Sequence, residues 1–294
     1  CELEEVKKMK KIKNPNLINS MNTKTILKNL FKFSLGLTLI SPLLKEEPAQ
    51  AFLTACADTN TVADLSGEAN PCFLTPEMLK VKFFEIGFCT SDPLATGTFV
   101  NTTCSKSWDN TSGFETDIGK KSFESMVGTT YKVPNNTYGY AYAIMNNTWS
   151  YKAQYKLTHS GGTTYYTNST NGLVTTTESD YGEWTDDISY MDGQETTNKC
   201  YDFEASTTGG TVKAVLTNSS LVTATDTTTC NNATRVAGSV ALSSSVTMDD
   251  SVKGYKLNWK ITDMGIGLSD NGNANNIPYD WRGGPFTPVF TLIK

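Results

Sequence analysis

An acidic segment holds the side chains best suited to metal binding. Asp186, Asp187 and Asp192 lie close together, and residues 186–192 contain no basic side chain. Carboxylate oxygens are hard ligands of the kind that calcium prefers. We expect no cofactor, and calcium held by these three residues is the one alternative. Their spacing does not match an EF-hand loop, and a solvated acidic loop is the ordinary alternative. Two of these carboxylates could also act in a hydrolase, which requires a separation of about 5 to 9 Å between them.

A row of aromatic residues forms the second candidate site. Asn146-Asn147 is interpreted as a two-residue hairpin turn, which pairs the strand before it with the strand after it and brings five rings onto one face. Such a face could stack on sugar rings, and a packed core is the ordinary alternative. The candidate ligand-binding residues are Tyr138, Tyr140, Tyr142, Trp149 and Tyr151.

The sequence contains a single histidine, His159. A Ser-His-Asp triad would depend on this one residue, and an HExxH zinc site needs two histidines. No GxSxG elbow, Walker loop or GxGxxG motif is present in the sequence either. We therefore expect a protein that is not an enzyme and has no catalytic residues.

The amino-terminal residues have the features of an export signal. Residues 21–51 contain a basic stretch, an apolar stretch at 33–44 and the sequence Ala49-Gln50-Ala51. An apolar stretch this short does not span a bilayer, and the three parts together predict a cleaved signal peptide. Residues 1–20 form a charged segment outside the fold, and residues 52–294 form the mature domain, for which no transmembrane helix is expected.

Six of the seven cysteines follow the predicted cleavage site. An even number of cysteines in an exported chain predicts disulfide bonds. Proximity in the sequence favours three pairs, which are Cys56–Cys72, Cys89–Cys104 and Cys200–Cys230. The alternative for Cys56 is lipidation, because Leu53-Thr54-Ala55-Cys56 resembles a lipobox.

The residues after Ala51 include 16 basic and 25 acidic side chains, which gives a net charge of −9. A nucleic-acid partner or an anionic membrane partner is therefore disfavoured. The expected partners are further copies of the chain, or a glycan or other molecule at a cell surface.

Period-two patterns predict an all-β fold, an antiparallel β-sandwich or jelly-roll-like domain held by disulfides. Residues 236–248 and 255–261 form two expected strands, which residues 249–254 join as a hairpin. Gly209-Gly210 predicts another hairpin, in which Phe203 pairs with Leu216. Residues 159–232 are a possible protruding section of the domain.

One short motif carries a resemblance. The segment KVKFFEIGFCTSDP, Lys80 to Pro93, precedes Cys104 and a tyrosine-rich stretch after Thr137. Over residues 78–158 the chain resembles uncharacterised exported β-rich proteins of marine bacteria. The resemblance implies a secreted, periplasmic or cell-surface protein and supports the Cys89–Cys104 pair, but it implies no activity.

These observations favour a secreted or surface protein with a non-enzymatic structural role, such as a filament, surface-layer or adhesin subunit. A carbohydrate-binding module on the aromatic row is the first alternative. A secreted hydrolase that uses the acidic segment is the second.

Overall fold

The computed structural model describes residues 53–56, 71–120, 125–157, 162–189, 191, 203–207, 209–270 and 278–294. Nearly all of its secondary structure is antiparallel β-sheet, which confirms the expected fold class. The predicted signal peptide, the upstream segment and His159 lie outside the described residues.

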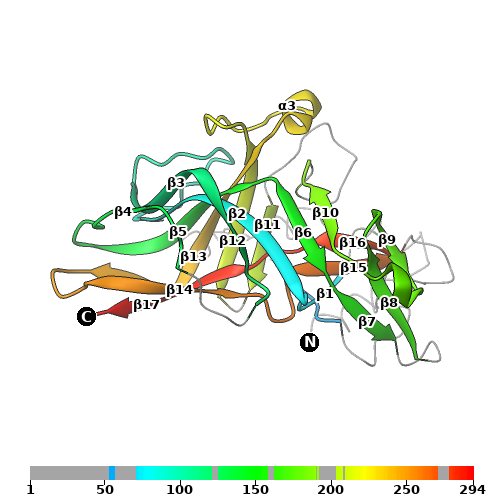
Figure 1. Cartoon of the computed structure of the whole chain (residues 1–294). Helices are drawn as coiled ribbons and strands as arrows, with labels where there is room; N and C mark the ends of the chain where they lie inside the picture. Colours follow the sequence, from blue (N-terminus) through cyan, green and yellow to red (C-terminus); the bar gives the residue numbers. More distant parts are fainter. Residues whose placement is uncertain are drawn as a thin grey trace, which may run out of the picture. The chain divides into compact units, whose positions relative to one another are not determined.

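The largest sheet contains nine strands (Figure 1). They are β2 (Met78–Cys89), β3 (Cys104–Asp117), β4 (Thr129–Thr130), β5 (Asn136–Asn146), β6 (Thr148–Lys152), β10 (Trp184–Asp187), β11 (Phe203–Thr207), β12 (Gly210–Thr217) and β13 (Arg235–Met248). Seven of them follow the order β10-β6-β2-β5-β13-β12-β11, while β3 pairs with β2 and β4 pairs with β3.

Strands β5 and β6 follow one another along the same side of β2. Residues 83–89 of β2 pair with β5 and residues 78–80 pair with β6, both antiparallel. The chain therefore keeps its direction through Asn146-Asn147, and the expected hairpin at these residues is wrong. Since β2 offers hydrogen-bond partners to both segments, no reversal is needed. Asn147 instead accepts a hydrogen bond from the backbone N–H of Ile188 at 2.8 Å.

A bulge in β2 keeps its apolar residues on one face. Leu79 and Phe83 are buried at odd-numbered positions, whereas Ile86 and Phe88 are buried at even-numbered positions. The pairing register shifts between Phe83 and Glu85. Because a bulge adds one residue to a strand, it reverses the alternation of side chains. The apolar residues on both sides of the bulge thus lie on the same face of the sheet.

Two smaller sheets complete the fold. The six-stranded sheet has the order β1-β15-β16-β9-β8-β7, and a two-stranded ribbon pairs β14 with β17. The strands are β1 (Cys72–Leu74), β7 (Gln154–Leu157), β8 (Thr163–Asn168), β9 (Asn171–Thr175), β14 (Gly254–Lys260), β15 (Ile266–Asp270), β16 (Pro278–Gly283) and β17 (Thr287–Ile293). Because β14 pairs with β17, the expected hairpin between β13 and β14 is wrong.

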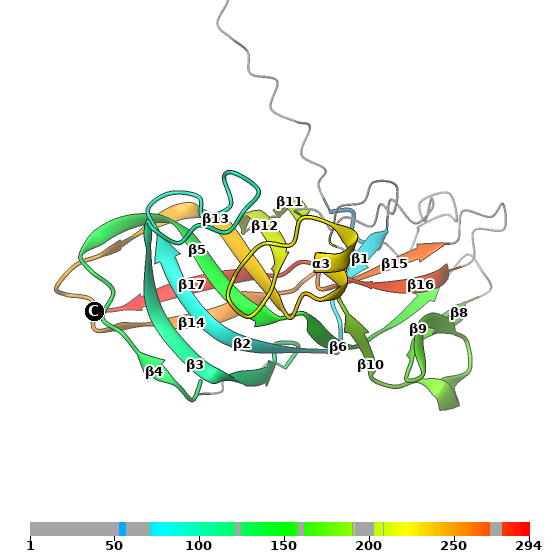
Figure 2. The same ribbon diagram turned by 90° about the horizontal axis from the view of Figure 1, so that it is seen from above.

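The ribbon lies against one face of the nine-stranded sheet, called the inner face below (Figure 1 and Figure 2). Trp259 of β14 stacks on Phe83 of β2, with ring centroids 4.8 Å apart. Phe290 of β17 packs against Phe88 of β2 at 4.6 Å. This packing of one layer on another is the sandwich arrangement expected from the period-two patterns.

The hairpin predicted at Gly209-Gly210 is present with a shifted register. Phe203 pairs with Ala214 instead of Leu216. A shift of two residues leaves every side chain on its face, so the residues of this hairpin that were predicted to share one face still do so. The strands of the possible protruding section, residues 159–232, pair with strands outside it, since β12 pairs with β13 and β9 pairs with β16.

Two predicted disulfides are confirmed, Cys56–Cys72 and Cys89–Cys104. Because Cys56 is bonded to Cys72, the lipidation alternative for Cys56 is wrong. Cys230 is also disulfide-bonded, and its predicted partner Cys200 lies outside the described residues.

The short helix α3 (Thr227–Asn231) carries Cys230. Asp226 caps this helix, because its carboxylate accepts a hydrogen bond from the backbone N–H of Thr229 at 2.8 Å. The cap fixes the chain direction just before β13 begins.

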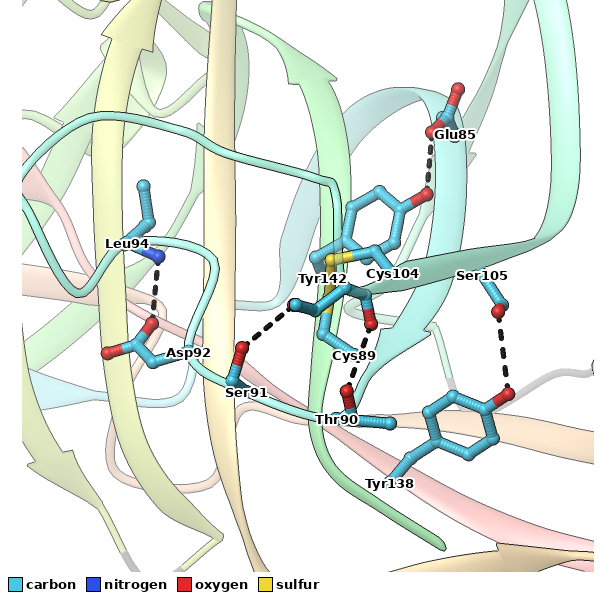
Figure 3. Close-up of a disulfide and its surroundings, with 11 residues drawn as sticks. Glu85, Cys89, Thr90, Ser91, Asp92, Leu94, Cys104, Ser105, Tyr138 and Tyr142 are labelled. Carbon is cyan, nitrogen blue, oxygen red and sulfur yellow. Dashed lines mark hydrogen bonds between the residues drawn. A yellow bond between two sulfur atoms is a disulfide. The ribbon is translucent and has the colours of Figure 1, made fainter. Parts of the chain in front are cut away.

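The face of the large sheet opposite the ribbon is called the outer face below. The Cys89–Cys104 bond anchors a segment that covers part of this face (Figure 3). Residues 90–103 leave the end of β2, and their Leu94 packs with Tyr142 in a buried cluster. The Tyr142 hydroxyl donates to Glu85 at 2.6 Å. The outer face is therefore partly a second core and not a fully solvated surface.

Replacing Cys89 and Cys104 together by serine is expected to lower the free energy of unfolding by about 3 kcal/mol. The disulfide closes a loop with a sequence separation of 15 residues, and without it the unfolded chain gains conformational freedom. Urea denaturation followed by circular dichroism measures the change. A loss below about 1 kcal/mol would show that residues 90–103 hold their place without the bond.

Candidate functional site

A cavity of about 380 Å³ lies between the inner face of the large sheet and the ribbon. Four of the five tryptophans of the chain line it, which are Trp149, Trp184, Trp259 and Trp281. Small-molecule sites are typically concave and mostly apolar, with volumes of about 300 to 1,000 Å³. The cavity has the size and lining of such a site.

Strands β6 and β10 place two of these tryptophans beside a carboxylate. In the antiparallel pairing, Trp184 lies opposite Tyr151, and Asp186 lies opposite Trp149. Residues two apart on a strand share a face, so Trp184 and Asp186 both belong to the inner face. The Trp184 ring stacks on the Tyr151 ring with centroids 5.3 Å apart.

Small side chains of the central strands form the floor of the cavity. Ala143 of β5, Gly238 of β13 and Ala214 of β12 lie side by side across the sheet. All three line the cavity. Larger side chains at these positions would fill the space, so the short side chains leave the volume open.

The ribbon and the chain before β17 form the opposite wall. Trp259 packs edge to face on Phe286 at 5.2 Å, and Phe286 also contacts Trp149 at 5.3 Å. Trp281 of β16 donates its indole N–H to the backbone carbonyl of Tyr166 at 3.0 Å. The indole ring of Trp281 is thereby held in one orientation at the wall.

Gly283 lets the two sheets meet beside the cavity. The hydroxyl of Tyr151 lies against this glycine so closely that a side-chain carbon at 283 would overlap it. Tyr151 is fully buried, and in the described part of the chain its hydroxyl has no hydrogen-bond partner. Burial, together with the charge of Asp186, raises the pKa of Tyr151 well above its ordinary value.

Asp186 is a partly buried carboxylic acid in the wall of the cavity. Burial raises its pKa to about 6, and the nearby charges of Asp187 and Asp280 add to the effect. Asp187 accepts a hydrogen bond from Thr148 at 2.6 Å, and Asp280 pairs with Arg282 at 3.4 Å. No described residue donates a hydrogen bond to Asp186 or forms an ion pair with it.

A second, more polar hollow of about 910 Å³ includes Lys132, Lys253 and Lys256 among its walls. Two of its hydroxyls, those of Ser107 and Tyr255, bond to each other at 2.7 Å. It lacks the continuous aromatic lining of the first cavity, which we therefore take as the candidate site.

The five residues of the predicted aromatic row do not form one exposed platform. Tyr142 packs in the outer cluster, whereas Trp149 and Tyr151 pack in the core of the inner face. Tyr138 is buried and Tyr140 is half-buried. The row divides because residues 136–152 run on without a hairpin. Two of the five residues, Tyr142 and Trp149, contribute to the lining of the tryptophan-lined cavity, and Trp149 belongs to the inner face.

The predicted calcium ligands do not form a site in the described part of the chain. Asp186 and Asp187 are neighbours on β10, so their side chains point to opposite faces. Asp192 lies outside the described residues. Among the residues that are described, no three His, Cys, Asp or Glu side chains gather closely enough to hold a metal ion.

The cavity itself was not predicted from the sequence. Its walls come from strands far apart in the chain, and no local pattern joins Trp149 to Trp259 or Trp281. One signal was present, however. Trp184, Asp186 and Ile188 alternate, which places an acid on an otherwise apolar face.

Comparison of the chain with protein-family models, with curated proteins and with solved structures gives no match. Within the described residues, no helix has the length and apolar composition needed to cross a membrane.

Asp186→Asn is expected to gain stability relative to the wild type as the pH rises. A raised pKa means that the folded wild type binds a proton more tightly than the unfolded chain, so the wild type loses stability between pH 3.8 and about 6. Asparagine does not titrate. Because Asp186 is only half-buried, we expect the difference between variant and wild type to change by about 1 to 2 kcal/mol.

Urea denaturation at pH 4 and pH 7.5 measures this difference. Asp180→Asn is the matched control, because Asp180 is exposed in the 3-10 helix η3 (Glu178–Asp180). Equal pH dependence of the Asp186→Asn variant and the wild type would contradict the environment described for Asp186.

Proposed function

We propose that this is an exported, non-enzymatic binding protein that holds a small, largely apolar molecule in the tryptophan-lined cavity. The observation that carries the proposal is the cavity of about 380 Å³ with four tryptophans in its walls. Burying apolar ligand surface against such walls is favourable, by about 25 cal/mol for each Å² removed from water. A cavity of this kind differs from a packed core, which leaves few voids larger than a water molecule.

The disulfides support the exported part of the proposal. Bonds such as Cys56–Cys72 and Cys89–Cys104 persist in oxidising compartments and are rare in the cytosol. The bonds are consistent with secretion, a periplasmic location or the cell surface. The predicted signal peptide, residues 21–51, would deliver the chain there.

A neutral apolar fluorophore, N-phenyl-1-naphthylamine, is expected to bind the oxidised protein at one site and to quench tryptophan emission. Ala214→Leu should weaken this binding at least about tenfold, because the larger side chain occupies the floor of the cavity. Fluorescence titration measures both effects.

Ala95→Leu is the matched control, because Ala95 is exposed in the segment that covers the outer face. It makes the same change of side chain away from the cavity and should leave binding unchanged. Circular dichroism verifies that both variants fold. If the folded Ala214→Leu variant binds the fluorophore as well as the wild type does, the cavity is not the binding site.

A second candidate function is the structural role expected from the sequence, in which copies of the chain assemble at a surface. It is favoured by the ribbon, since β14 and β17 pair only with each other among the described strands. Each strand therefore presents an edge with unpaired backbone groups, which is a template for pairing with another chain.

Assembly through the ribbon predicts that the mass in solution rises with protein concentration. Light scattering from 1 to 100 µM, as a rough working range, measures it. A mass equal to one chain at every concentration would remove this candidate.

A further inference from the structure

The cavity is charged at one end, and its charges indicate the class of ligand. This inference rests on the proposed function, because it concerns what the same cavity takes. The charged residues of its described lining are Asp186, Asp187, Asp280 and Arg282. Asp187 points to the opposite face of β10, and the remaining two acids and one base leave a net negative charge. The one cation of the described lining, Arg282, already pairs with Asp280 at 3.4 Å.

Asp186 lies beside two indole rings. Trp184 precedes it by two residues on the same face of β10, and Trp149 lies directly opposite it on β6. Directly opposed residues in an antiparallel pair have their Cβ atoms about 5 Å apart. One carboxylate therefore shares its surroundings with two aromatic rings, in a place partly withdrawn from water.

Both kinds of group attract the same ligand. A carboxylate attracts a cation, and more strongly where water is partly excluded. An indole ring attracts a cation placed over its face, and tryptophan does so best among the aromatic residues. The carboxylate has no partner among the described residues, so a cationic ligand would satisfy a group that these residues leave unpaired.

We propose that the cavity binds an organic cation, a small molecule whose ammonium group lies against Asp186 and whose apolar body lies among the tryptophan rings. An anionic ligand such as a fatty acid would bring its carboxylate against Asp186. A neutral ligand would gain the apolar contacts but would leave the charge of Asp186 uncompensated. An organic cation would gain the apolar contacts and would also compensate the charge of Asp186.

Three ligands that share a phenyl group separate these possibilities. 2-Phenylethylammonium, 2-phenylethanol and 3-phenylpropanoate are titrated at pH 7.5 into the full chain with its disulfides formed, in competition with N-phenyl-1-naphthylamine. We expect the ammonium compound to bind about tenfold more tightly than the alcohol. We expect the carboxylate compound to bind more weakly than the alcohol.

Asp186→Asn is expected to remove the preference for the ammonium compound while keeping the binding of the alcohol. Asp180→Asn, an exposed acid outside the cavity, should keep the preference. Equal binding of ammonium compound and alcohol by the wild type, or an undiminished preference in Asp186→Asn, would overturn the inference and leave the proposed function standing. If the fluorophore binds but none of the three compounds displaces it, the inference fails and the proposed function stands. If the fluorophore itself does not bind, both proposals fail.

Discussion

The pairing of β2 with one long stretch of chain is the constraint on which the rest of the structure depends. Within residues 136–152, residues 140–145 and 150–152 pair with β2, and both pairings are antiparallel. Period-two alternation then sends every second side chain of this stretch to the inner face. The bulge near Phe83 keeps the apolar residues of β2 on that same face. The ribbon can bury this face only because both strands present it continuously.

The same constraint divides the predicted aromatic row between the two faces of the sheet. Ala143 and Met145 are followed, again at odd numbers, by Trp149 and Tyr151, and these residues share the inner core. Tyr142 belongs to the opposite face, where residues 90–103 cover it. A hairpin at Asn146-Asn147 would have joined the two sets. The continuous strand instead separates them, and the cavity takes its shape from small residues between large rings.

Local patterns predicted the elements better than they predicted their partners. The alternation over residues 255–261 and the close disulfide pairs were readable because they depend on neighbouring residues. The pairing of β14 with β17 was not, since a ribbon of this kind requires knowledge of contacts across some thirty residues. The prediction of a turn at Asn146-Asn147 was wrong for the same reason, because pairing with the remote strand β2 determines whether the chain reverses.

The cavity shows this limit most clearly. Each of its tryptophans occupies a position that alternation alone would turn inward. The local sequence does not show, however, that four of these rings line a cavity instead of packing directly against one another. Asp186 is the exception, because an acid between Trp184 and Ile188 on one strand face is a conflict visible in the sequence. Such conflicts between local pattern and residue type are where functional groups are expected.

A crystal of the protein held under xenon pressure gives the most direct test of the central claim, which is that an apolar cavity exists beneath the ribbon. Apolar cavities bind xenon. The structure predicts a xenon peak in the cavity, next to the small residues of its floor, Ala143, Ala214 and Gly238. Closely packed side chains in this place, with no xenon between them, would contradict the account.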